Sequence, residues 1–252
     1  MKKPQAALLL STLVLSGAAF GQAKAEPDST LSFNAGAVTD YRYRGISQSA
    51  KRPALQGGAD FVHRSGFYVG AWGSTIAWIK DTPPATRGSL EVDLYGGYKG
   101  TAGPLGFDVG VLQYWYPRNN YTLATGENAN TTEVYGALSY GPATAKYSHA
   151  LTDLFGTPNS DGSGYLDLSA TFDLGNGFTV VPHVGWQKIR NFLTYRDISV
   201  TLAKDFGGGL SASAALVTTN FERRFGAPFT LPGSGTRDLA DTGLVLGVKY
   251  SF

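Results

Sequence analysis

Cysteine is absent from the 252 residues, and only 16% of the residues are charged. The lack of cysteine excludes a disulfide-stapled fold and a lipoprotein anchored through a cysteine after its leader. No spacing typical of a metal site or a phosphate-binding loop is found, so we expect no cofactor. Beyond the leader, no apolar run approaches the roughly 18 residues that a membrane-spanning helix needs. These absences leave few classes of soluble or helical membrane protein open.

The first 25 residues have the order of a secretory signal peptide. A basic start, "MKKPQ", precedes a short apolar run and an "AKA" site that ends at Ala25. We therefore expect residues 1–25 to be a signal peptide and residues 26–252 the mature protein. Loss of Lys2, Lys3 and Lys24 lowers Lys+Arg from 21 to 18, against 19 acidic residues. A net charge near −1 gives no reason to expect a nucleic-acid partner.

Glycine and aromatic residues are abundant where charge is scarce. Glycine accounts for 33 residues, and phenylalanine, tryptophan and tyrosine together make up 13%, whereas a typical soluble domain has about 7% glycine and about 25% charged residues. This composition suits a surface that faces lipid. Lipid satisfies no backbone polar group, so a chain that crosses a membrane without helices must close a β-barrel.

Apolar and polar residues alternate with a period of two from Leu31 to Phe252. The alternation predicts about 12 strands of about ten residues, the first over residues 31–44 and the last over residues 242–252. Short glycine-rich turns alternate strictly with longer polar connections, the longest near residues 221–239. Even strand numbers with short turns on one side and long loops on the other are typical of outer-membrane barrels. Counts of ten or fourteen strands stay open, because residues 189–194 and the longest loop are ambiguous.

A soluble β-sandwich would alternate as well, but its turns would not sort by length and its polar faces would carry more lysine and glutamate. Aromatic residues also gather near the predicted strand ends, as in the aromatic girdles of membrane barrels. These residues are Tyr41, Tyr43, Phe61, Phe67, Tyr98, Trp115, Tyr140, Phe172, Phe178, Trp186 and Tyr250. The sequence thus favours an all-β, antiparallel up-and-down transmembrane barrel.

The polar columns of the predicted strands are expected to line the lumen. The candidate lining residues are Asp40, Arg42, Arg44, Gln56, Asp60, Glu91, Asp93, Asp108, Glu133, Lys146 and Asp167. Of these, Asp40, Arg42, Arg44, Asp60, Glu91 and Asp93 are expected nearest the outer half of the barrel. Carboxylates outnumber cations on this phasing, which predicts a narrow pore with a weak preference for cations.

Two arrangements of these charges stay open. Eight-stranded barrels are filled by side chains and sixteen-stranded ones leave a channel, so about 12 strands could hold either a salt-bridged plug or a water-filled path. Arg42 and Arg44 are expected where the first strand leaves for its outer loop. There they would form a basic patch at the mouth, or pair with Asp60 and neighbouring carboxylates.

Residues 35–72 resemble the opening of the TorF family of porins from Gram-negative bacteria. The resemblance rests on "YRYRGISQS" at residues 41–49, followed by "PALQG" at residues 53–57. It implies an outer-membrane barrel of porin type and says little about cargo. The final Phe252 is similar to the terminal aromatic residue that the barrel-assembly machinery recognises in many outer-membrane proteins, and we expect it to be an insertion signal. The predicted partners are therefore outer-membrane lipid, that machinery and small polar solutes, whereas the oligomeric state stays open.

Two other functions compete with a channel. An outer-membrane lipase or protease would need a nucleophile near a base, but the adjacent Ser148 and His149 would point to opposite faces of a strand. A barrel without an open path, used for structure or adhesion, is the second alternative. In that case the longest loop could fold inward as a plug or outward as a binding surface. The channel is the preferred interpretation, and no enzymatic activity is expected.

Overall fold

The computed structural model describes residues 28–252, and the predicted signal peptide lies outside the described residues. Its wall is a closed antiparallel barrel of 12 strands, in which each strand pairs with its neighbours along the chain. The wall strands are β1 Ser29–Val38, β4 Ala54–His63, β5 Phe67–Thr75, β6 Leu90–Ala102, β7 Leu105–Trp115, β8 Thr131–Tyr140, β9 Ala143–Ala150, β10 Gly164–Ala170 continued by β11 Phe172–Gly175, β12 Phe178–Lys188, β13 Thr194–Gly207, β14 Leu210–Thr219 and β15 Gly243–Ser251.

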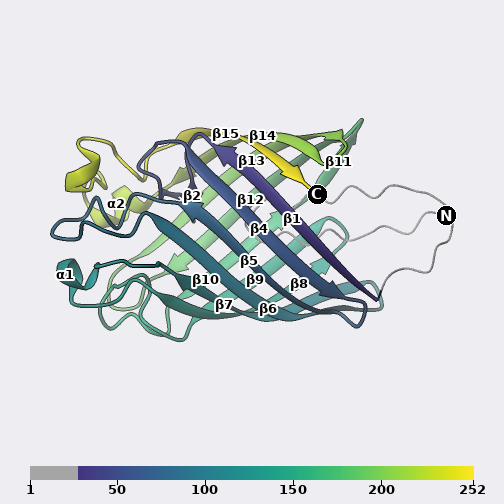
Figure 1. Ribbon diagram of the computed structural model, residues 1–252, viewed down its shortest axis with the longest axis horizontal. Coiled ribbons are helices and arrows are strands. Elements are labelled where there is room, and N and C mark those ends of the chain that lie inside the picture. Colours follow the sequence, from purple (N-terminus) through teal and green to yellow (C-terminus); the bar gives the residue numbers. More distant parts are fainter. Residues whose placement is uncertain (1–27) are drawn as a thin grey trace.

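The seam between β1 and β15 closes the barrel. Ala35 lies opposite Tyr250 and Ala37 opposite Val248 in an antiparallel register. Beyond the last strand residue, the backbones of Phe33 and Phe252 exchange two hydrogen bonds of 2.9 Å, and their rings stack at 5.9 Å. The first and last strands therefore lie side by side, as Figure 1 shows.

Short turns and long loops are sorted to opposite ends of the barrel (Figure 1). The turn between β11 and β12 shows why glycine-rich pairs make the short turns: Asn176 and Gly177 both have positive φ, of 53° and 76°, which a two-residue hairpin turn requires. The opposite end carries helix α1 (Thr122–Thr125), helix α2 (Phe221–Phe225) and the 3-10 turn η1 (Pro232–Ser234). No helix within residues 28–252 is long and apolar enough to cross a membrane. We call the long-loop end the outer end, by analogy with outer-membrane barrels.

The outer face of the wall is apolar on every side. On β15, Leu244, Leu246, Val248 and Tyr250 are exposed, and the residues between them are partly buried. The same alternation on β8 exposes Val134 and Leu138 and buries Glu133 and Tyr135. A belt of exposed leucine, valine and phenylalanine of this extent marks a surface that contacts lipid.

The predicted first strand is too long. Its wall portion ends at Val38, and the following residues turn inward instead of continuing to Arg44. They include the two-residue strands β2 (Arg42–Tyr43) and β3 (Ile46–Ser47), which form a separate small sheet. Tyr41, which is only 7% exposed, and the partly buried Tyr43 are therefore not part of an outer aromatic girdle.

Candidate functional site

The loop between β1 and β4 folds into the barrel as a hairpin, here called the lumen hairpin (residues 40–48). Its two short strands are joined by Arg44 and Gly45, which have φ values of 47° and 84°. Two successive residues with positive φ make the tight turn of a β-hairpin, and Gly45 suits the second position because it has no Cβ. The sequence "YRYRGIS" therefore folds back on itself at Arg44.

The tip of the lumen hairpin lies against β14 and β13, which are the second and third strands from β1 around the barrel. A Cβ added to Gly45 would lie 2.8 Å from the Cβ of Asp197 on β13 and 2.8 Å from the Cβ of Thr219 on β14. The hairpin leaves the wall between β1 and β4, so its tip abuts strands far from its origin in the chain. The hairpin therefore lies inside the lumen, near the outer end of the barrel.

Arg44 connects three wall strands from the tip of the hairpin. Its Nη2 donates to both carboxylate oxygens of Glu133, at 2.9 and 2.8 Å, and its Nη1 donates to Oε1 of Gln187 at 2.6 Å. The guanidinium also lies 4.3 Å from the ring centre of Tyr165. The side chains of Arg44 and Glu133 are 5% and 2% exposed. Burial alone would lower the pKa of Arg44, but the charge of Glu133 raises this pKa well above its ordinary value, so the guanidinium stays charged.

The base of the lumen hairpin is held by a second ion pair. Nε of Arg42 donates to Asp40 at 2.8 Å and Nη2 donates to Asp241 at 3.1 Å, so the hairpin is tied to the last outer loop. The hydroxyls of Ser47 and Ser49 both donate to Oδ1 of Asp40. These contacts satisfy the buried charges locally, which a low-dielectric interior requires.

One half of the interior, between β5 and β9, is packed with tyrosines that bind carboxylates. Tyr41 donates to Glu91 at 2.6 Å, Tyr68 donates to Asp108 at 2.6 Å and Tyr95 donates to Asp60 at 2.5 Å. Burial, reinforced by the neighbouring Glu91, raises the pKa of Tyr41 well above its ordinary value, so its hydroxyl remains a donor. The ammonium of Lys146 lies 4.0 Å from the ring centre of Tyr135. This half of the barrel is filled by side chains.

Glycines on neighbouring strands make room for these rings. Directly opposite pairs join Tyr68 to Gly97, Tyr95 to Gly70 and Tyr135 to Gly110. A Cβ on Gly97 would lie 2.5 Å from the hydroxyl of Tyr68, and one on Gly110 would lie 2.5 Å from that of Tyr135. Each ring thus lies across a glycine, an arrangement that also covers the exposed glycine backbone.

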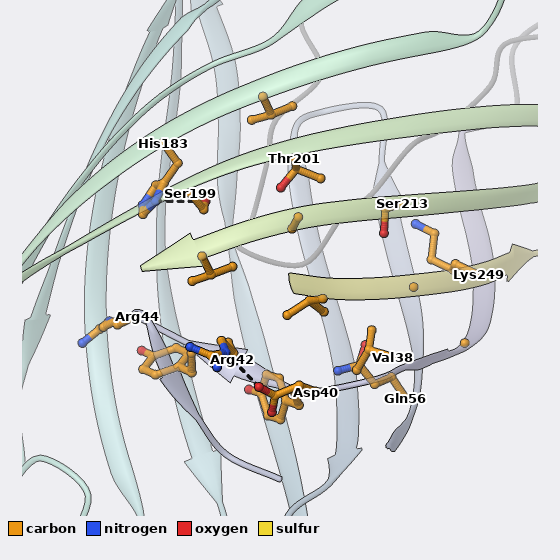
Figure 2. Close-up of a pocket in the computed structure, with 18 of the residues that line it drawn as sticks. Val38, Asp40, Arg42, Arg44, Gln56, His183, Ser199, Thr201, Ser213 and Lys249 are labelled. Carbon is orange, nitrogen blue, oxygen red and sulfur yellow. Dashed lines mark hydrogen bonds and ion pairs between the residues drawn. The ribbon is translucent and has the colours of Figure 1, made fainter. Parts of the chain in front are cut away.

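The other half of the interior holds a cavity of about 300 Å³. It runs from the lumen hairpin along β1, β4 and β12 to β15. Its lining combines alanine and valine side chains of β14 and β15 with hydroxyl, amide and charged side chains, among them Asn34, Gln56, Ser199, Thr201, Ser213 and Lys249. In Figure 2 Arg44, Arg42 and Asp40 lie toward one end of this cavity, and Ser213 and Lys249 toward the other. A cavity with polar and charged side chains in its lining therefore lies beside the packed half.

A histidine lies between two carboxylates in the cavity wall. Nε2 of His183 lies 3.0 Å from Asp167 and 3.1 Å from the hydroxyl of Tyr165, while Nδ1 lies 3.6 Å from Asp197 and 3.5 Å from Oγ of Ser199. This set includes a serine, a histidine and an aspartate in contact. However, β13 pairs along its length with β12 and β14, so the backbone around Ser199 offers no free N–H pair for an oxyanion. The arrangement is suited to binding rather than to acyl transfer.

The structure separates the predicted lining residues into two groups. Asp40, Arg42, Arg44, Gln56, Asp60 and Asp167 border the cavity. Glu91, Asp93, Asp108, Glu133 and Lys146 lie in the packed half, where Glu91, Asp108 and Glu133 are each 2% exposed. Asp93 has a buried Oδ1 with no hydrogen-bond partner among the described residues.

Three placements differ from expectation. Arg42 and Arg44 lie in the lumen hairpin, not in a wall strand, and their partners are Asp40, Asp241 and Glu133 rather than Asp60. Asp60 is the seventh of the ten residues of β4, counted from the outer end, so it belongs to the inner half. The segment that enters the lumen is the first outer loop rather than the longest one. The longest loop instead covers the hairpin. The backbone N–H of Ser47 in the hairpin donates to the carbonyl of Leu239 in this loop at 2.8 Å.

Sequence reasoning named neither the interior tyrosines nor His183 among the candidate site residues. Once the strand register is known, a tyrosine directly opposite a glycine is the pattern that could identify these tyrosines. No such pattern identifies His183, since its partners Asp167 and Asp197 lie on other strands.

The serine and histidine considered for an enzyme are separated as expected for neighbours on a strand. Ser148 is buried inside the barrel, and His149 lies on the outer face, where its ring stacks on that of Tyr147 at 6.4 Å. They do not form a catalytic pair.

A closed, lipid-facing barrel with a polar interior defines a protein of the porin fold class. The solved KdgM porin superposes with a TM-score of 0.56 at 9% identity, over 88% of this chain and 99% of that one. The NanC porin superposes with a TM-score of 0.53 at 12% identity, over 88% and 99%. At these identities the similarity is one of fold.

The chain belongs to the Gcw_chp family, described as a bacterial protein of unknown function, whose model matches residues 22–252. No curated protein sequence matches the chain at a significant level. The resemblance to the TorF family therefore stays a prediction.

Proposed function

We propose that this protein is an outer-membrane channel that lets small polar solutes or ions diffuse through a narrow, charge-lined lumen. The observation that carries the proposal is the polar cavity of about 300 Å³ inside a lipid-facing barrel. A barrel filled by side chains would not leave a cavity of this size, and a soluble protein would not expose an apolar belt. The same belt supports a location in the Gram-negative outer membrane after export to the periplasm.

The charges of the interior favour cations and neutral solutes over anions. Asp40, Asp60, Asp167 and Asp197 border the cavity together with Arg42, Arg44, Lys249 and His183. Arg42 pairs with Asp40 and Asp241, and Arg44 pairs with Glu133, so these charges compensate one another. Asp60, Asp167 and Asp197 then remain in the cavity against Lys249 and His183. Rings of carboxylates select cations.

One structural relative was solved with oligogalacturonate, a polyanion. Because carboxylates outnumber cations in the present interior, we do not extend that ligand to this chain.

The lumen hairpin sets the size limit in this proposal. It extends from the side of β1 and β4, where Arg42 binds Asp40, across to β8, where Arg44 binds Glu133. Loops that fold into a barrel narrow it without changing the strand number. Solutes would therefore pass beside the hairpin, along the strands from β12 to β1.

Planar-bilayer recordings test the proposal. In a KCl gradient, the purified protein is expected to conduct and to show a reversal potential of the sign that K⁺ preference gives. A preference for Cl⁻ would reject the cation selectivity, and a protein that inserts without conducting would reject the channel.

A variant with a shortened hairpin tests the size limit. Replacing residues 40–52 by a short glycine–serine linker is expected to raise conductance several-fold and to admit larger sugars in liposome swelling. The matched control replaces residues 122–127 around α1, which has no buried residue, and should conduct like the wild type. Equal conductance of both variants would show that the hairpin does not limit passage.

A further inference from the structure

Three basic side chains form a compact group on the outward face of the barrel at its outer end. Lys188 on β12 lies directly opposite Thr194 on β13. The carbonyl of Thr194 accepts a hydrogen bond of 3.0 Å from Nε of Arg224 on α2. Arg196 is two residues further along β13, on the same face as Thr194, and lies opposite Trp186. The register and this hydrogen bond therefore bring Lys188, Arg196 and Arg224 together.

These cations face outward and not into the lumen. The residues that alternate with them, Gln187 and Tyr195, are buried in the interior, whereas Lys188, Arg196 and Arg224 are exposed.

No carboxylate among residues 28–252 forms an ion pair with any of the three. By contrast, the nearby Arg190 pairs with Asp161 at 3.2 Å. The group is thus a local excess of positive charge.

Exposed aromatic rings adjoin the three cations. Phe192, in the loop between β12 and β13, is 50% exposed, and Phe225 at the end of α2 is 45% exposed; their ring centres are 6.0 Å apart. On the inner side of the group, the outward column of β13 continues with Ile198 and Val200, which are 50% and 47% exposed. Cations therefore lie at the boundary between an apolar belt and the outer loops.

We propose that this patch, made of Lys188, Arg196, Arg224, Phe192 and Phe225, binds the phosphorylated glycolipid of the outer leaflet. Arginine and lysine bind phosphate oxygens through charge-assisted hydrogen bonds. A lipid headgroup at this height brings its phosphates to the cations and its acyl chains to the apolar column below them. The inference rests on the proposed outer-membrane location and is independent of conductance.

The test uses the full mature chain, refolded and reconstituted in nanodiscs that contain a small fraction of bisphosphorylated lipid A. Lipid that co-purifies after exchange into detergent is counted by native mass spectrometry. The wild type is expected to retain lipid A, and the triple variant Lys188→Gln, Arg196→Gln, Arg224→Gln is expected to retain at least tenfold less. Arg87→Gln, which removes an exposed cation on another outer loop, is the matched control and should retain lipid A like the wild type.

Equal retention by the triple variant would overturn the proposal, and so would equal retention of lipid A from which both phosphates have been removed. Heat-modified gel mobility shows that each variant is folded. Conductance is measured separately in bilayers without lipid A, so failure of the channel proposal is distinguishable from failure of this one. Phosphatidylglycerol that binds as tightly as lipid A would reject the glycolipid as the specific occupant.

Discussion

The guanidinium of Arg44 contacts residues of β8, β10 and β12. Its contribution to the free energy of unfolding depends on its burial. A buried ion pair gains little over a well-packed apolar pair, yet loss of one partner costs about 3–5 kcal/mol because the other charge remains buried. An exposed pair is worth about 0–1 kcal/mol. The pair of Arg44 with Glu133 is of the first kind and the pair of Arg190 with Asp161, which are 52% and 57% exposed, is of the second.

The first prediction compares these two pairs. Arg44→Met is expected to lower the free energy of unfolding by about 3 kcal/mol, because Glu133 is left buried without its partner. The double variant with Glu133→Gln should recover most of that loss, whereas Arg190→Gln should cost less than about 1 kcal/mol. Urea unfolding in lipid vesicles, followed by tryptophan fluorescence, measures all three.

A double variant as unstable as Arg44→Met would contradict this account. It would mean that the guanidinium stabilises the barrel through Gln187 and Tyr165 rather than through the charge of Glu133.

Single strands of the wall separate two environments by alternation alone. On β13, Ile198, Val200 and Leu202 are 50%, 47% and 44% exposed and face lipid, while Ser199 and Thr201 border the cavity. One face of the strand contacts hydrocarbon and the other faces the polar interior. Neighbouring residues in the chain therefore need side chains of opposite polarity.

The second prediction uses two neighbours on β13. Val200→Arg is expected to destabilise the barrel by about 2–4 kcal/mol, because it places a cation in the lipid belt near the middle of the strand. Thr201→Arg is expected to leave stability nearly unchanged but to lower conductance, since its guanidinium enters the cavity. Unfolding in vesicles and single-channel recording separate the two effects. Similar destabilisation by both changes would show that the assigned faces are wrong.

The whole barrel is divided into a packed half and an open half. Tyrosines fill the side formed by β5 to β9, and the cavity follows β10, β12 to β15, β1 and β4. A barrel of this strand number lies between filled and open ones, and the protein uses both arrangements at once. The lumen hairpin narrows the open half from the outer end.

The third prediction concerns salt. If the carboxylates of the cavity select cations by their field, the preference should weaken as the Debye length falls from about 10 Å at 0.1 M to about 3 Å at 1 M. The ratio of K⁺ to Cl⁻ permeability, obtained from reversal potentials at fixed concentration ratio, should therefore approach one at high salt. A ratio that stays constant would indicate selection by direct coordination at the hairpin instead.

Much of the architecture could be predicted from the sequence. The alternation in residues 243–251 predicts both the strand and its lipid-facing side, because a period of two leaves only the choice of face. The sorting of short and long connections predicts an up-and-down barrel. Short turns and long loops can both be recognised from local residue types. Alternation alone predicts Glu91, Asp108 and Glu133 on the inward face, but it predicts neither the pairing of Glu133 with Arg44 nor the tyrosine partners of Glu91 and Asp108.

The amino-acid pattern is enough to predict the wall, since contact with lipid imposes a pattern on each strand separately. That residues 40–48 leave the wall and enter the lumen follows only from the folded barrel. A wall strand and an inner hairpin share the same period, and Tyr41 and Arg44 find their partners 50 and 89 residues away. Local pattern carries no information about such distant contacts, so the position of the constriction emerges only when the barrel closes around it.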